Sequence, residues 1–105
     1  MVLLDFTGSD WCGWCIKLDK EVFSEPSFQA YAAQNLIFVE VDFPRNKSQS
    51  AEVKERNQKL QQKYGVRGYP TLIVLNPQGS QVAQLGYQPG GAGPFIGSLE
   101  ALKGK

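Results

Sequence analysis

Residues 2–15 read VLLDFTGSDWCGWC and place two cysteines, Cys12 and Cys15, at the junction of two predicted elements. The apolar run 2–6 predicts a buried strand, and the polar loop 7–10 ends in residues that commonly cap helices. A helix is therefore expected from about Cys12. Apolar residues recur there at roughly helical spacing, which predicts an inward-facing stripe of Cys15, Ile16, Leu18, Val22 and Phe23.

A second helix and a second strand follow. Pro26 cannot continue the hydrogen-bond pattern of a helix, but proline is tolerated in a first turn, so a short helix is expected over residues 26–33. The next segment, residues 36–42, is β-branched and almost continuously apolar. Such a composition predicts a strand that is covered on both faces.

The second half of the chain predicts a surface helix, a hairpin and a final helix. Residues 51–63 are rich in Glu, Lys and Gln, which favours a helix with a solvated charged face. The runs 71–75 and 80–85 flank a turn and predict antiparallel pairing. Residues 94–103 predict an amphipathic helix with an inward face of Phe95, Ile96, Leu99 and Leu102. The order β-α-β-α-β-β-α then gives a mixed sheet with helices on both faces.

Composition excludes several classes of function. The chain has 105 residues, with 11 Lys+Arg against 10 Asp+Glu, a balance that argues against a dedicated nucleic-acid binder. Its length fits one domain with a modest core. No apolar run is long enough to span a bilayer. The absence of histidine excludes His-dependent triads and zinc sites with His ligands.

The residues alone leave three interpretations of the Cys12–Cys15 pair. The start of a helix stabilises a thiolate, so Cys12 is expected to be an exposed nucleophile and Cys15, one turn later, to resolve a mixed disulfide. The alternatives are half of a metal site shared between two chains and a pair of inert core cysteines. The strand–helix–strand context favours the redox pair.

Three stretches together resemble the thioredoxin superfamily: residues 5–6, residues 11–15 and residues 64–71, which read YGVRGYPT. Residues 21–28 (EVFSEPSF) resemble the branch of bacterial exported thiol:disulfide interchange proteins that includes the C-terminal domain of DsbD. The resemblance implies an α/β, thioredoxin-like fold with a mixed four-stranded sheet. It also implies a single domain over residues 1–105 that lacks the first strand and helix of the family, so we expect that an upstream segment was removed.

The resemblance implies roles for individual residues. Cys12 would be the attacking thiolate and Cys15 the resolving thiol. Pro70 would be the cis-proline of the family, which turns the backbone of Tyr69 toward an extended substrate. An ordinary trans-proline at the start of a strand is the alternative. The other substrate-facing residues implied by the resemblance are Trp11, Gly13 and Trp14.

Asp5 matches the buried carboxylate that lies beneath the cysteine pair in the family and can take the proton of Cys15. A solvated aspartate at the end of a strand is the alternative. Glu40 stands where a lysine often accompanies this buried acid. A second carboxylate near Asp5 is expected to raise the pKa of Asp5 rather than lower it.

The function implied by the resemblance is that of a thiol:disulfide oxidoreductase, a reductase or isomerase of protein disulfides. Trp14 cannot stabilise a thiolate as a cationic histidine between the cysteines does, so we expect a reducing to intermediate potential. Two alternatives stay open: an electron-relay domain that passes reducing equivalents between partner proteins, and a redox-inert thioredoxin-like binding module.

The resemblance also implies the partners and location of the protein. The partners would be protein thiols and disulfides and a thiol electron donor, with no nucleic acid, and the chain would be a monomer. No cofactor or metal is expected beyond the redox-active Cys12–Cys15 disulfide. The location would be the periplasm or another exported compartment. The chain carries no signal of its own, so a cytoplasmic location stays open.

Overall fold

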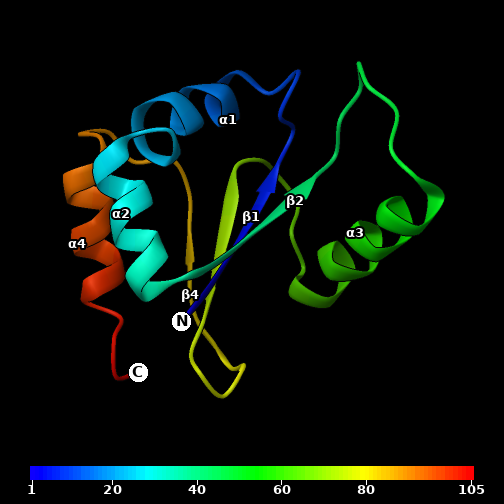
Figure 1. Ribbon diagram of the computed structural model, residues 1–105. Helices are drawn as coiled ribbons and strands as arrows, with labels where there is room; N and C mark the ends of the chain where they lie inside the picture. The colour runs from blue at the N-terminus through cyan, green and yellow to red at the C-terminus, as the bar shows by residue number, and fades with distance from the viewer.

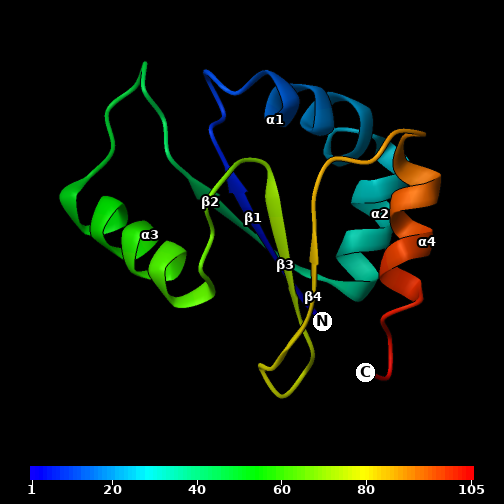
Figure 2. The ribbon, with the colours of Figure 1, turned by 180° about the vertical axis from the view of Figure 1, so that it is seen from behind.

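A four-stranded mixed sheet forms the centre of the computed structural model, which describes residues 1–105 (Figures 1 and 2). The strands lie in the order β2-β1-β3-β4; β1 pairs in parallel with β2 and antiparallel with β3, and β3 and β4 form a hairpin. The thioredoxin-like α/β fold class predicted from the sequence is confirmed. In chain order the elements are β1 (Val2–Thr7), α1 (Gly13–Leu18), the π-helical turn η1 (Asp19–Phe23), α2 (Pro26–Asn35), β2 (Ile37–Asp42), α3 (Ala51–Tyr64), β3 (Thr71–Leu75), β4 (Gln81–Leu85) and α4 (Ala92–Glu100).

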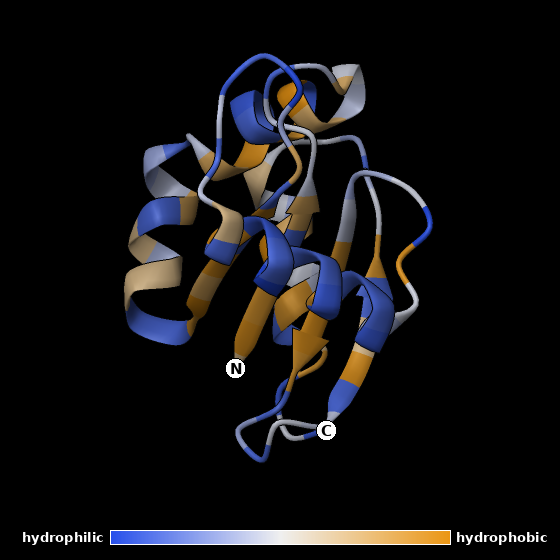
Figure 3. Ribbon diagram, turned by 90° about the vertical axis from the view of Figure 1, so that its right-hand side faces the viewer, coloured by the Kyte–Doolittle hydropathy of each residue, from blue (hydrophilic) through white to orange (hydrophobic).

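Helices cover the two faces of the sheet unequally. Figure 1 shows α1, α2 and α4 on one side of the sheet and α3 alone on the other. The side chains of alternate residues of β1 point to opposite faces of the sheet. Leu3 belongs to the core under α1, α2 and α4, whereas Leu4 and Phe6 belong to the core on the side of α3. In Figure 3 the helix α3 is mostly hydrophilic and the strands are mostly hydrophobic. None of the helices is both long enough and apolar enough to cross a membrane.

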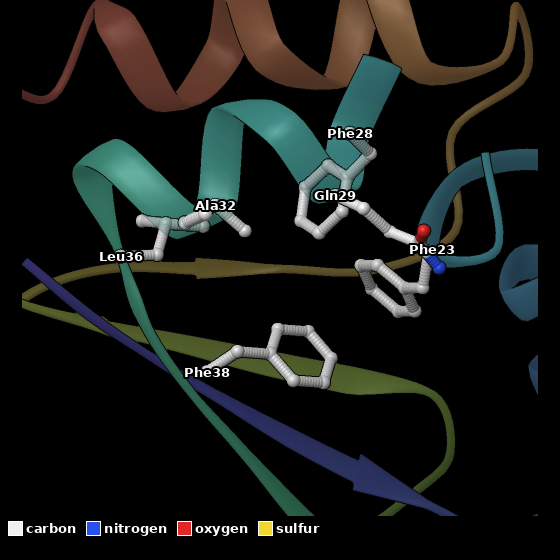
Figure 4. A pocket seen from close by; sticks show the side chains of 7 residues that line it. Phe23, Phe28, Gln29, Ala32, Leu36 and Phe38 are labelled. Atoms are coloured by element: carbon white, nitrogen blue, oxygen red, sulfur yellow. The ribbon is translucent and has the colours of Figure 1, made fainter. Parts of the chain in front are cut away.

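The prediction that residues 36–42 form a strand covered on both faces is wrong. β2 lies at the edge of the sheet and pairs only with β1. Ile37 is 65% exposed and Phe38 is 36% exposed. Phe38 lines a shallow apolar groove of about 340 Å³ together with Phe23 and residues of α2, among them Phe28 (Figure 4). The apolar composition of β2 therefore belongs to an edge strand beside an open groove and not to a strand covered on both faces.

The helical boundaries and faces also differ from the predictions in detail. Ile16 was expected in the inward stripe, but it is 48% exposed, whereas Cys15, Leu18 and Val22 are buried. Ile16 follows Cys15 directly, and one residue of helix turns the side chain by about 100° away from the sheet. The last helix starts at Ala92 and ends at Glu100, earlier at both ends than the predicted range of 94–103.

Candidate active site

Cys12 and Cys15 form a disulfide at the start of α1. Cys12 is the N-cap residue, and the backbone N–H of Cys15 donates to the Sγ of Cys12 at 3.3 Å. The Cα atoms of the pair are 5.2 Å apart. Cys12 was expected to be exposed, yet it is only 8% exposed, against 4% for Cys15. Cys12 is the more exposed residue of the two. Aromatic residues lie on both sides of the motif.

The N-cap differs from the one that the polar loop suggested. Ser9 donates from its backbone N–H and from its hydroxyl to the carboxylate of Asp42, at 3.0 and 2.5 Å. Asp10 accepts from the backbone N–H groups of Arg45 and Asn46, each at 3.0 Å. These hydrogen bonds lower the pKa of Asp10. Ser9 therefore holds the end of β2, and Asp10 the loop after it, against the cysteine loop, and the cap is left to Cys12.

Trp11 is fixed on three sides. Its indole Nε1–H donates to the carbonyl oxygen of Phe43 at 2.6 Å. The guanidinium of Arg45 lies 3.7 Å from the ring centroid, which is a cation–π contact. The ring of Tyr69 meets the indole edge-to-face, with centroids 5.7 Å apart. This arrangement connects the residue before Cys12 with the residue before Pro70.

Gly8 lies directly against the indole of Trp11, and its lack of a side chain leaves room for the ring. A Cβ at Gly8 would overlap the indole, and the contacts of Trp11 leave the ring no place to move. Gly8→Ala is therefore expected to lower the free energy of unfolding by about 1–3 kcal/mol, measured by urea denaturation. Gly97→Ala is the matched control: a Cβ at Gly97 meets nothing within 4 Å on the exposed side of α4, so stability is expected to hold or rise. Equal losses in the two variants would contradict the prediction.

A second aromatic pair lies on the other side of the motif. Trp14 is 58% exposed and packs on Tyr87, with ring centroids 5.0 Å apart. The ammonium of Lys17 lies 5.3 Å from the ring centroid of Trp14 and 5.5 Å from that of Tyr87. The Tyr87 hydroxyl donates to Glu21 at 2.5 Å, and this bond raises the pKa of Tyr87. The exposed indole of Trp14, two residues after Cys12, thus packs against Tyr87 and Lys17.

The Tyr69–Pro70 peptide bond is cis, as the resemblance implies. Pro70 directly precedes β3, and the Thr71 hydroxyl donates to the carbonyl of Gly68 at 2.6 Å, which closes the turn around the proline. Because Tyr69 contacts Trp11, this turn lies on the same rim as the cysteine motif.

Asp5 lies in the middle of β1 and is 5% exposed, so the alternative of a solvated aspartate is wrong. Its Oδ1 atom is buried and has no hydrogen-bond partner. Burial first, and then the negative charges of Glu40, Asp19 and Asp42, raises the pKa of Asp5 to about 7. Glu40 is the direct neighbour of Asp5 in the parallel pairing of β1 with β2. Asp5 is therefore a carboxyl group that changes charge near neutral pH.

The site brings together most of the residues that the sequence singled out. The cysteine motif with Trp11, Gly13 and Trp14 occupies one rim, Tyr69 and Pro70 join it through Trp11, and Asp5 lies in the sheet beneath. Sequence reasoning missed Tyr87, Arg45 and Phe43. The sequence does carry a signal for Tyr87, because it is the only aromatic residue in a glycine-rich loop. No group of three or more His, Cys, Asp or Glu residues is arranged to hold a metal ion.

The sequence profile of a family described as "Thioredoxin-like domain" matches residues 1–92. The chain belongs to this thioredoxin-like family. A relative from Chlamydia pneumoniae, "Disulfide bond reductase DsbH", is 40% identical over 103 residues. That match covers 97% of this chain but 62% of the relative, so the thioredoxin-like chain spans less than two thirds of that protein.

Two solved structures show the same thioredoxin-like arrangement. The structure of "DsbH Oxidoreductase" has a TM-score of 0.91 and 38% identity, and the match covers 96% of this chain and 70% of that one. The reduced C-terminal domain of DsbD from Neisseria meningitidis has a TM-score of 0.66 and 26% identity, and the match covers 97% of this chain and 80% of that one. The resemblance to the DsbD branch that residues 21–28 suggested is confirmed.

Proposed function

We propose that this chain is a thiol:disulfide oxidoreductase that reduces protein disulfides through Cys12 and Cys15. The observation that carries the proposal is the disulfide at the start of α1, between the Trp11–Tyr69 and Trp14–Tyr87 pairs. The similarity to a protein named disulfide bond reductase supports the reducing direction. The residues proposed to contact the substrate are Trp11, Gly13, Trp14, Tyr69 and Pro70.

The reaction transfers two electrons from the reduced pair to the substrate. The thiolate of Cys12 attacks one sulfur of the substrate disulfide, and the other substrate sulfur leaves as a thiolate. Asp5 then takes the proton of Cys15, whose sulfur attacks the Sγ of Cys12. The mixed disulfide breaks, the second substrate thiolate leaves, and the Cys12–Cys15 disulfide forms. A thiol donor reduces this disulfide and completes the cycle.

We also propose partners and a location for the protein. The partners are protein disulfides and a thiol electron donor, and the redox centre is the cysteine pair itself without a bound cofactor. We place the protein in the periplasm or another exported compartment, where such substrates occur, and we expect it to act as a monomer.

Two measurements test the proposal. The chain is expected to catalyse the reduction of insulin by dithiothreitol, followed by the turbidity of the released B chain. Its reduction potential is expected between about −270 mV, the value of thioredoxin, and about −180 mV, that of protein disulfide isomerase. A dedicated electron relay would be slow on insulin but would still exchange electrons with glutathione. A cysteine pair that does not cycle at all would indicate a binding module.

A further inference from the structure

The loop between β2 and α3 places a cation at the rim of the cysteine motif. Figures 1 and 2 show this loop beside the loop that leads into α1. The backbone N–H groups of Arg45 and Asn46 donate to the carboxylate of Asp10, each at 3.0 Å, and join the two loops. The side-chain amide of Asn46 also donates to the carbonyl oxygen of Asp10 at 3.1 Å. The backbone of Arg45 is therefore fixed beside the start of the cysteine motif.

The side chain of Arg45 is exposed and has no charged partner of its own. Its guanidinium lies 3.7 Å from the ring centroid of Trp11. It takes part in none of the ion pairs of the chain and donates no hydrogen bond. The nearby carboxylates have other partners, because Asp10 accepts from backbone N–H groups and Asp42 pairs with Lys47 at 3.4 Å. The N–H donors of the guanidinium are therefore free to bind an external carboxylate.

The cation on the other side of the motif already has a carboxylate. Lys17 lies 5.3 Å from the ring centroid of Trp14, and a carboxylate oxygen of Glu21 lies 4.0 Å from its ammonium nitrogen. Each of the two tryptophans thus contacts one cation, but only the cation on Trp11 lacks an anionic partner. An acidic group from outside the chain therefore finds its free partner on the Trp11 side of the motif.

Arg45 also lies close to the edge proposed to contact the substrate. The indole of Trp11 that contacts Arg45 also meets the ring of Tyr69, with centroids 5.7 Å apart. Burial raises the pKa of the Tyr69 hydroxyl, and the positive charge of Arg45 opposes that rise. The field of the guanidinium therefore extends to the residue before Pro70. An extended substrate that lies along Tyr69 and Pro70 with one sulfur at Cys12 passes beside this charge.

We propose that Arg45 is a specificity-determining residue that binds a carboxylate of the substrate, so that disulfides flanked by aspartate or glutamate are reduced faster than others. The inference rests on the proposed function, in which Cys12 attacks the substrate. A guanidinium can bind a carboxylate through two parallel N–H···O hydrogen bonds. Because Trp11 and Asp10 restrict Arg45 before the substrate arrives, less side-chain entropy is lost on binding. The chain as a whole adds little preference, since 11 Lys+Arg balance 10 Asp+Glu.

The test compares peptides that differ by one side chain near a single cysteine. Each peptide has blocked ends and a neutral sequence, and its cysteine is joined by a disulfide to 2-thiopyridine. Glutamate, glutamine or lysine is placed within about four residues on either side of the cysteine, which is roughly 13 Å of extended chain. Cys12 of the reduced protein attacks the peptide sulfur, and pyridine-2-thiolate leaves with the electron pair of the broken bond. Its absorbance gives the second-order rate constant.

The natural chain is expected to prefer the acidic peptide. At the most responsive position, the glutamate peptide is expected to react about fivefold faster than the glutamine peptide, and the lysine peptide slowest. This ratio is expected to fall to about one in Arg45→Gln. Arg45→Lys keeps the charge but not the parallel donors, so about a twofold preference is expected. In about 1 M NaCl, where charges are screened beyond about 3 Å, the ratio of the natural chain is expected to fall.

Lys59→Gln is the matched control for the loss of one positive charge. Lys59 lies on α3 and pairs with Glu55 at 3.1 Å, so this variant is expected to keep the full preference. Each ratio compares two peptides on the same protein, so a general change in activity cancels. Comparison with the natural chain also cancels any effect of the glutamate on the reactivity of its own disulfide.

The outcomes separate this inference from the proposed function. Equal rates of the glutamate and glutamine peptides at every position in the natural chain would overturn the inference. So would an undiminished preference in Arg45→Gln or in Arg45→Lys. In these cases the released thiolate still shows that Cys12 attacks disulfides, and the proposed function stands. If the natural chain attacks none of the peptides and does not reduce insulin, the proposed function itself is overturned.

Discussion

Replacing Cys12 with serine is expected to lower the rate of insulin reduction by on the order of a thousandfold or more, to the level of dithiothreitol alone. Cys12 caps α1 and is the more exposed residue of the pair, and a serine hydroxyl cannot form the mixed disulfide. The measurement is the turbidity assay with each variant at equal concentration. The fold is expected to survive, because serine can cap a helix as well as cysteine does.

Replacing Cys15 with serine is expected to give a different defect. Cys12 still attacks the substrate, but no second thiol releases it, so a covalent adduct accumulates. Incubation of Cys15→Ser with oxidised insulin, followed by mass spectrometry without reductant, is expected to show this adduct. The Cys12→Ser variant serves as the matched control and is expected to show little of it. Equal trapping by both variants would mean that the roles of the two sulfurs are wrongly assigned.

Replacing Asp5 with asparagine is expected to stabilise the oxidised protein at pH 8. The pKa of Asp5 is about 7 in the fold and about 3.9 in an unfolded chain, so the folded protein binds more protons between these values. Stability from this group is therefore fully present below about pH 4 and is lost as the pH rises to 7. The total loss is about 4 kcal/mol, and a neutral asparagine of the same shape avoids it.

The test of this prediction is the free energy of unfolding in urea at pH 5 and pH 8, measured for both proteins. The difference between Asp5→Asn and the natural chain is expected to grow in favour of the variant as the pH rises. This comparison cancels the effect of every other titrating group that the two proteins share. A difference that stays constant with pH would show that Asp5 is charged in the fold at both pH values.

The sequence predicted elements well where the signal is local. Proline at position 26 and glycine at position 65 mark the start of α2 and the end of α3, and the turn after β3 has typical turn residues. The pairing of strands that lie far apart in the chain was harder to predict from the sequence. The apolar run of β2 indicates a strand, but composition does not reveal whether a second strand lies beside it.

The same distinction holds for the site. Cys12 and Cys15 lie in one short sequence motif and Pro70 lies in another, so the sequence alone predicted all three residues. Ser9 and Asp10 are good helix caps by residue type, but their actual partners lie more than thirty positions away. Tyr87 contacts Trp14 only because the loop after β4 folds back over α1. Contacts of this kind depend on the packing of the whole fold, which no local pattern encodes.

The open edge of β2 has a consequence for the colloidal behaviour of the protein. An edge strand presents unpaired backbone groups, and the exposed Ile37 and Phe38 add an apolar surface to it. Strands of this kind can add to one another between molecules unless a charge interrupts them. In β2 that charge is Glu40, which stands near the middle of the strand with its side chain exposed. The replacements that position 40 tolerates are thus limited by the need to keep separate molecules apart.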